Sequence, residues 1–119
     1  MGTTANSKMT FEEFDRLTKG RKTGCYGYGV EMYTRRTGDR SRAFQIKWYE
    51  RNSKYPTHRH WKRALAKARS GWMPQGGLGS EWVEKRRTFP YTPEGLAEAV
   101  AFSEEIQPMR EEFWNREDD

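Results

Sequence analysis

The spacing of apolar residues divides the chain into segments with helical and with extended periods. Apolar side chains recur at helical spacing over residues 11–17. Thr10 and Glu13 stand three positions apart at the start of this segment, which is the spacing of a capping box. The pattern therefore predicts a short N-terminal helix that ends near Gly20.

Beyond this helix the apolar period changes to two. Apolar and polar residues alternate on both sides of a Thr-Gly-Asp turn at 37–39. Two such runs around a glycine-containing turn predict an antiparallel hairpin, with strands over 26–36 and 42–51 and a loop of about five residues. The apolar set forms one face of the hairpin, and the other face is rich in cations and tyrosines. That second face presents Tyr33, Arg35, Gln45, Lys47, Tyr49 and Arg51.

Helical spacing returns over residues 57–70. Trp61 and Leu65 belong to a narrow apolar stripe, and Thr57 is placed to cap the first turn. Much of the remaining circumference is cationic and comprises Arg59, Lys62, Arg63, Lys67 and Arg69. Gly71 stands where helices often end, and the glycine-rich residues 71–80 predict an irregular loop.

The last third of the chain predicts a strand and a helix. Residues 81–90 are extended in pattern and carry Arg86 among other cations. Thr92 and Pro93 have the chemistry of an N-cap and a first helical position. Apolar residues then continue at helical spacing to Ile106, before Pro108 ends or kinks the helix.

These elements predict an α+β fold. We expect a three-stranded antiparallel sheet packed on a C-terminal helix, with an N-terminal helix and a basic helical insert between strands two and three. A chain of 119 residues suits one domain with one core. We expect that domain over residues 10–107, a disordered N-terminus over 1–9, and an acidic C-terminal tail over 108–119.

The distribution of charge adds a functional prediction. Residues 35–70 carry twelve Lys or Arg against two acidic residues, a balance of +10, whereas residues 92–119 carry nine acidic residues against two Arg, a balance of −7. Aromatic side chains are interleaved with the cations of the basic stretch: Phe44, Trp48, Tyr49, Tyr55 and Trp61. Clustered cations with flat rings favour a polyanion that offers faces for stacking, which indicates nucleic acid.

The sequence gives no positive evidence for catalysis. A lone Cys25 excludes an internal disulfide framework and a cysteine-based zinc site. On a helix, His58 and His60 point about 200° apart and do not share a metal. The glycines of 76–79 lack the Lys-Ser/Thr of a phosphate-binding loop. We therefore expect no enzyme, no metal and no cofactor.

The expected compartment is the cytoplasm. No apolar run approaches the roughly 18 residues of a membrane span. The first eight residues lack the apolar region of a secretory signal. We expect a cytoplasmic protein without membrane contact.

Residues 85–99, with the sequence KRRTFPYTPEGLAEA, combine a basic strand ending in Phe with a Thr-capped helix that has acidic and Ala positions. This unit resembles the amino-terminal arm-binding domains of phage integrases, and it is similar to DNA-binding domains of the plant ethylene-response-factor type. The resemblance covers about half of the chain, from about 28–51 and from 85–106. It implies a three-stranded sheet that packs one face on a helix and lays the other in the DNA major groove. The chain departs from these families by inserting residues 52–80 between strands two and three, and we expect no recombinase activity.

The first functional hypothesis is a small DNA-binding protein encoded by a phage or another mobile element, in the host cytoplasm. Duplex DNA would contact the hairpin face, the basic helix and the third strand. The predicted contact residues are Tyr33, Arg35, Gln45, Lys47, Tyr49, Arg51, Arg59, Arg63, Lys67 and Arg86. The alternative is a phage-type inhibitor or host-takeover protein that binds a host protein complex, steered by the basic patch. An RNA-binding module is a third possibility, because aromatic and basic sheets also stack unpaired bases.

Overall fold

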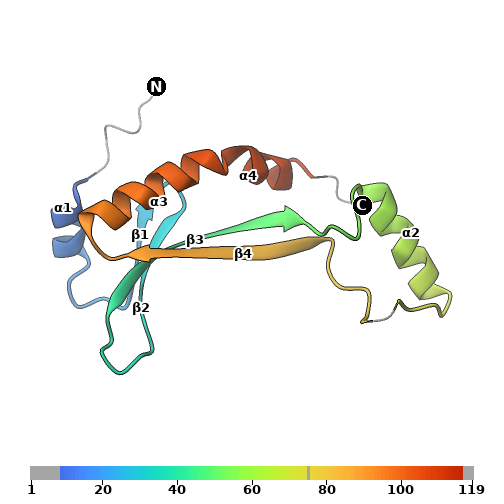
Figure 1. The fold of residues 1–119 in the computed structure, drawn as a ribbon, viewed down its shortest axis with the longest axis horizontal. Coiled ribbons are helices and arrows are strands. Elements are labelled where there is room, and N and C mark those ends of the chain that lie inside the picture. Colours follow the sequence, from blue (N-terminus) through green and yellow to red (C-terminus); the bar gives the residue numbers. More distant parts are fainter. Residues whose placement is uncertain (1–8, 75, 117–119) are drawn as a thin grey trace. The chain divides into compact units, whose positions relative to one another are not determined.

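A computed structural model describes residues 9–74 and 76–116 (Figure 1). The predictions for residues 1–8 and 117–119 lie outside the described residues. Over the described ranges, the chain forms helices and one sheet of order β1-β2-β3-β4, so the α+β class is confirmed. The elements are α1 (Phe11–Leu17), β1 (Thr23–Gly27), β2 (Val30–Thr34), β3 (Arg42–Arg51), α2 (His58–Arg69), β4 (Trp82–Pro90), α3 (Pro93–Glu105) and α4 (Gln107–Trp114).

The chain forms two compact units. The first comprises the described residues up to Lys47 together with Arg86–Gln107, and the second comprises Trp48–Lys85 together with the described residues from Pro108. Strands β3 and β4 contribute residues to both units. A single domain over residues 10–107 stays a prediction.

The sheet has four strands where three were predicted. Residues 26–36 were expected to form one strand, but a tight turn at 27–29 separates β1 from β2. Gly27, Tyr28 and Gly29 all have positive φ, of 118°, 57° and 78°. Glycine adopts such angles without steric cost, so the two glycines allow the chain to reverse here. The alternation of apolar and polar residues continues across this turn, so the turn could not be recognised from the sequence pattern.

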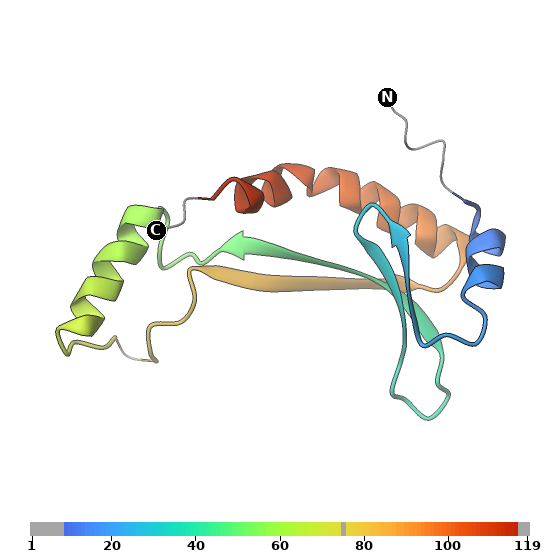
Figure 2. The same ribbon diagram turned by 180° about the vertical axis from the view of Figure 1, so that it is seen from behind.

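The core of the first unit lies between the strands and α3. Helix α3 contacts β2 and α1, and Figures 1 and 2 show it alongside the strands with α1 near its start. Thr92 caps α3 through a hydrogen bond from the Gly95 N–H, 2.9 Å long, and Pro93 occupies the first turn as predicted. The buried apolar side chains of this unit are Phe14, Val30, Met32, Ala43, Phe44, Ile46, Phe89, Leu96, Ala99 and Ile106.

A polar network anchors α1 to the start of β3. One guanidinium nitrogen of Arg42 donates to the Thr18 carbonyl at 3.0 Å, and another lies 3.5 Å from the Asp15 carboxylate. The Tyr91 hydroxyl donates to the same carboxylate at 2.7 Å. Burial raises the pKa of Tyr91, and its hydrogen bond to Asp15 raises it further, so the phenol remains protonated at neutral pH. The loop end of the β2–β3 hairpin is therefore held against α1.

The second unit is built around α2 and the ends of β3 and β4. The predicted stripe of α2 is confirmed, because Trp61 and Leu65 are half-buried while the cations of the helix are exposed. The Trp61 ring packs edge-on against Tyr55, with ring centroids 5.1 Å apart. Glu81 accepts hydrogen bonds from Arg51 at 2.7 Å and from His58 at 2.9 Å, which closes the segment between β3 and β4.

Residues 107–114 form a helix, α4, within the region predicted as an acidic tail. Phe113 stacks on Tyr49, with ring centroids 4.6 Å apart and planes at 16°, and it also meets Trp82 edge-on at 5.2 Å. Trp114 remains exposed. No helix in the described residues is long and apolar enough to cross a membrane.

Candidate nucleic-acid interface

The sheet register places predicted contact residues on the face opposite the core. Gln45 on β3 lies opposite Glu31 on β2, and Tyr33 follows two residues along β2 on the same face. Met32 and Phe44 of the alternate row are buried. The outer face therefore carries Tyr33 and Gln45, as the hairpin pattern predicted, and they border a shallow hollow of about 440 Å³.

Two further predicted residues are exposed cations of the first unit. Lys47 follows Gln45 by two positions on β3, so strand alternation assigns it to the same face. Arg86 is exposed on β4 and alternates with Arg87, whose guanidinium lies 4.7 Å from the Phe102 ring of α3. Because α3 covers the core face, Arg86 belongs to the outer face.

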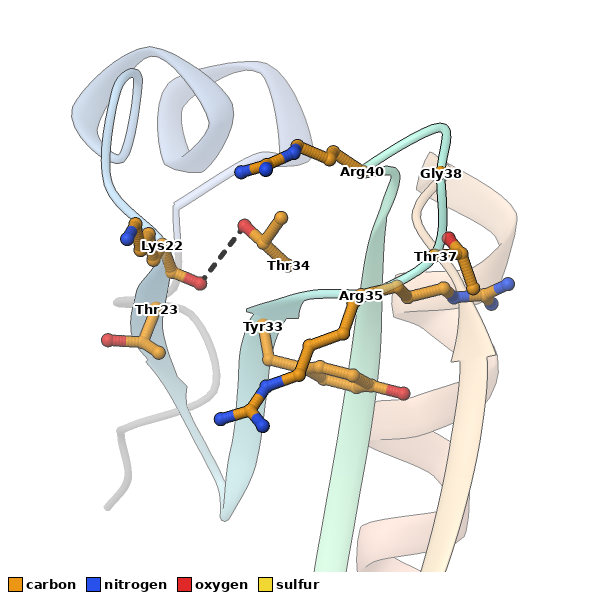
Figure 3. A pocket seen from close by; sticks show the side chains of 9 residues that line it. Lys22, Thr23, Tyr33, Thr34, Arg35, Thr37, Gly38 and Arg40 are labelled. Carbon is orange, nitrogen blue, oxygen red and sulfur yellow. Dashed lines mark hydrogen bonds between the residues drawn. The ribbon is translucent and has the colours of Figure 1, made fainter.

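A cationic hollow lies at the end of the β2–β3 hairpin (Figure 3). It has a volume of about 690 Å³, and four of its lining residues are cations: Lys22, Arg35, Arg36 and Arg40. We call these four residues the loop cation cluster. Tyr33 and the threonines 23, 34 and 37 supply the other side chains of the lining. Figure 3 shows the charged ends of Lys22, Arg35 and Arg40 separated from one another around the opening.

Strand pairing explains how Lys22 reaches residues of the loop. The N–H and the hydroxyl of Thr34 both donate to the Lys22 carbonyl, at 2.9 and 3.2 Å. These bonds hold the segment before β1 against the end of β2. The Arg35 N–H donates to the Ser41 carbonyl at 2.7 Å, so residues 36–40 project beyond the last hydrogen-bonded pair. The sequence predicted a loop of about this length over residues 37–41, but the strand before it, β2, ends at Thr34 and not at residue 36.

The loop is closed by a turn that places Arg40 in a left-handed conformation. The Arg40 N–H donates to the Thr37 carbonyl at 3.0 Å, and the φ angle of Arg40 is 51°. An arginine there carries a steric cost that glycine would not. Backbone strain of this kind is often found at functional positions, so the conformation of Arg40 as well as its charge indicates a functional role.

The acidic residue nearest the cluster is engaged in the turn. The Asp39 carboxylate accepts hydrogen bonds from the Thr37 hydroxyl and, at 3.1 Å, from the Ser41 N–H. The Thr37 bond and then the Ser41 bond lower the pKa of Asp39, so the carboxylate stays ionised. Among the described residues, no member of the loop cation cluster forms a salt bridge. The charge around the hollow is therefore net positive, with the Asp39 carboxylate offsetting only part of the charge of the four cations.

The remaining predicted residues belong to the second unit, where they fall into two groups. Tyr49 and Arg51 take part in packing: Tyr49 stacks on Phe113, and the Arg51 guanidinium pairs with Glu81 and lies 4.5 Å from the Trp82 ring centroid. The second group consists of exposed cations of α2 and comprises Arg59, Arg63 and Lys67. Arg59 and Arg63 border a hollow of about 470 Å³ on that helix. A nucleic-acid role for either group stays a prediction.

Sequence reasoning missed three members of the loop cation cluster, namely Lys22, Arg36 and Arg40. The spacing of arginines around the Thr-Gly-Asp turn was a usable signal for Arg36 and Arg40, because a loop of known length brings its two sides together. Lys22 gave no such signal. Its place depends on β1, which the sequence did not reveal as a separate strand.

Comparisons with protein-family models, with curated proteins and with solved structures found no match for this chain. The resemblance to integrase arm-binding and ethylene-response-factor domains therefore stays a prediction from residues 85–99.

Proposed function

We propose that this protein binds nucleic acid, with duplex DNA as its ligand, through the loop cation cluster and the adjoining outer face of β2 and β3. The observation that carries the proposal is the cluster itself. Four cations surround one hollow, and the nearest carboxylate, that of Asp39, is turned into the loop by its hydrogen bonds.

Such a cluster of like charges destabilises the isolated protein. Like charges that are close together repel each other, and the effect falls off with salt over a Debye length of about 8–10 Å. Arg40 adds backbone strain to this cost. A polyanion would offset both terms, because each phosphate contact releases a condensed counterion.

The chemistry of the lining suits a duplex. Guanidinium groups make paired hydrogen bonds to phosphate oxygens and to the major-groove edge of guanine. A two-stranded ribbon fits into the major groove, so the hairpin would place Arg35 and Arg36 near base edges. Gln45 and Tyr33 would extend the contact along the outer face. The proposed origin in a phage or another mobile element rests on the resemblance alone.

A salt titration with a variant of the cluster tests the proposal. Arg35→Ala, Arg36→Ala and Arg40→Gly together remove three cations. We expect the slope of log affinity for duplex DNA against log salt to become shallower by about 2–3 units. Fluorescence anisotropy of a labelled duplex at several salt concentrations measures the slope.

A matched control removes the same charge elsewhere. Arg16, Lys19 and Lys54 are exposed and line none of the hollows described above, so their replacement by Gln changes net charge equally. The control variant should retain most of the wild-type affinity for duplex DNA. Its slope of log affinity against log salt should be steeper than that of the cluster variant. If the two triple variants behave alike, the protein binds through diffuse charge and the proposed interface is wrong.

One observation favours a protein partner as a second candidate function. An apolar hollow of about 450 Å³ lies between α1 and α3 and is lined by side chains that include Phe11, Tyr26, Leu96 and Val100. Ala101 is exposed at its border. Ala101→Arg should abolish a salt-insensitive protein interaction at this hollow while leaving duplex affinity intact. If Ala101→Arg binds a candidate protein partner with the same affinity as the wild type, this hollow is not the site of that interaction.

A further inference from the structure

The end of α2 presents an exposed indole in a fixed backbone setting. Half of the Trp72 surface is exposed (50 %). The Gly71 N–H donates to the Ala68 carbonyl and the Trp72 N–H donates to the Lys67 carbonyl, both at 3.1 Å, and Gly71 has a φ of 104°. These are the two hydrogen bonds of a Schellman motif. The backbone of Trp72 is thereby tied to the last turn of the helix.

The residue that faces this indole explains its exposure. In a Schellman motif the side chain at the position of Trp72 commonly makes an apolar contact with the side chain at the position of Lys67. Here that partner is a cation, and the Lys67 ammonium lies 5.4 Å from the ring centroid of Trp72. The contact orients the ring without burying it. A half-exposed indole is therefore held next to a positive charge.

A row of cations leads along α2 to this ring. Arg59, Arg63 and Lys67 follow at intervals of four residues, which is an advance of about 6 Å per step along the helix with a small rotation. Helix α2 carries five Lys or Arg and no acidic residue among its twelve positions. Like charges at this spacing repel, and Arg59 in the first turn opposes the helix dipole, although Lys67 in the last turn is favourably placed. The helix thus retains unfavourable charge placements that a chain of phosphates would relieve.

We propose that Arg59, Arg63, Lys67 and Trp72 form a second nucleic-acid surface, specific for an unpaired strand, in which the cations contact successive phosphates and the Trp72 ring stacks on a base. The indole selects the ligand. In a duplex the base faces are stacked on one another, so only an unpaired base has a face free for the ring. The inference goes beyond the proposed function and does not depend on it, because no residue of this surface belongs to the first unit.

The test compares two labelled single strands of equal length with the full chain: an oligothymidine and its abasic counterpart, which has the same phosphates and no bases. The protein should bind oligothymidine more tightly than the abasic strand. Trp72→Ala should remove that preference, with a loss of oligothymidine affinity of about 5- to 150-fold, as found for single stacked bases. Trp72→Phe should keep most of it, because a smaller ring still stacks.

Two controls exclude trivial effects. Trp114 is also exposed (62 %) and lies on α4, so Trp114→Ala should leave the preference intact. Trp72→Ala should also leave duplex affinity unchanged, whereas the triple variant of the loop cation cluster should lower it. The inference is overturned if Trp72→Ala binds oligothymidine as the wild type does. It is equally overturned if that variant loses duplex and single-strand affinity to the same extent.

Discussion

The substitution Arg40→Gly should change stability and DNA binding in opposite directions. The backbone conformation of Arg40 predicts a gain in stability, and the loss of its charge predicts weaker binding. Its φ of 51° lies in the left-handed region, where a side chain costs about 1–2 kcal/mol relative to glycine. Arg40→Gly removes this cost but loses about 0.5–1 kcal/mol through the greater backbone entropy of glycine in the unfolded chain. The free energy of unfolding should therefore rise by about 0–1.5 kcal/mol, a shift in Tm of up to a few degrees.

The same substitution should weaken DNA binding. It removes one cation of the loop cation cluster, so the salt dependence should become shallower by about one unit of log affinity per log salt. A variant that is more stable and binds more weakly would identify Arg40 as a residue retained for binding at the expense of stability.

Arg40→Ala separates the two effects. Alanine removes the cation but keeps the left-handed strain, so its Tm should rise less than that of Arg40→Gly, through the loss of charge repulsion alone, while its binding falls like that of Arg40→Gly. Thermal denaturation and the duplex salt titration measure both quantities. The reasoning is refuted if Arg40→Gly lowers Tm, since the guanidinium would then stabilise the loop, or if it binds duplex with an unchanged salt slope.

Two further predictions concern the fold. Gly95→Ala should lower the free energy of unfolding by about 3 kcal/mol or more, because a Cβ at Gly95 would lie 1.9 Å from the Pro90 carbonyl oxygen. At an open helical position the same change would stabilise by about 1 kcal/mol, so an unchanged or higher Tm would contradict the close contact. Burial raises the pKa of Glu81, but hydrogen bonds from His58 and Arg51 outweigh it, so the pKa lies below its usual 4.5. These two hydrogen bonds therefore stabilise the folded state at pH values above the pKa of Glu81 in the unfolded chain. That stabilisation is lost as the pH falls through the lower pKa of Glu81 in the folded protein. Measured by denaturant unfolding, the free energy of unfolding of Glu81→Gln should depend less on pH below the usual pKa of Glu81 than that of the wild type. Identical pH profiles of the two proteins would exclude a stabilising role for the ionised Glu81.

Local interactions explain why the helices were predictable. The capping box of Thr10 and Glu13 forms as the sequence indicated, with the Glu13 N–H donating to the Thr10 hydroxyl at 3.1 Å. Thr57 and Thr92 cap α2 and α3 in the same way. These contacts join residues only a few positions apart, so the sequence specifies them without reference to the rest of the chain.

The faces of the hairpin were also predictable, whereas the number of strands was not. Alternation assigned Tyr33 and Gln45 to the face opposite the buried Met32 and Phe44. The turn at 27–29 preserves that alternation, so apolar spacing alone could not distinguish one strand from two. Only the backbone angles of the turn, which depend on the pairing of β1 with β2, reveal the fourth strand.

By itself, the sequence determined where α1, α2 and α3 begin, the faces of Tyr33 and Gln45, and the concentration of cations between residues 35 and 70, because each depends on neighbours along the chain. The tertiary structure decided which of those cations share a surface. Lys22 lines the same hollow as Arg40 because Thr34 bonds to the Lys22 carbonyl, and Arg51 takes part in packing because Glu81 and Trp82 lie beside it. Such juxtapositions depend on contacts between residues far apart in the chain, which hydrophobic spacing does not encode.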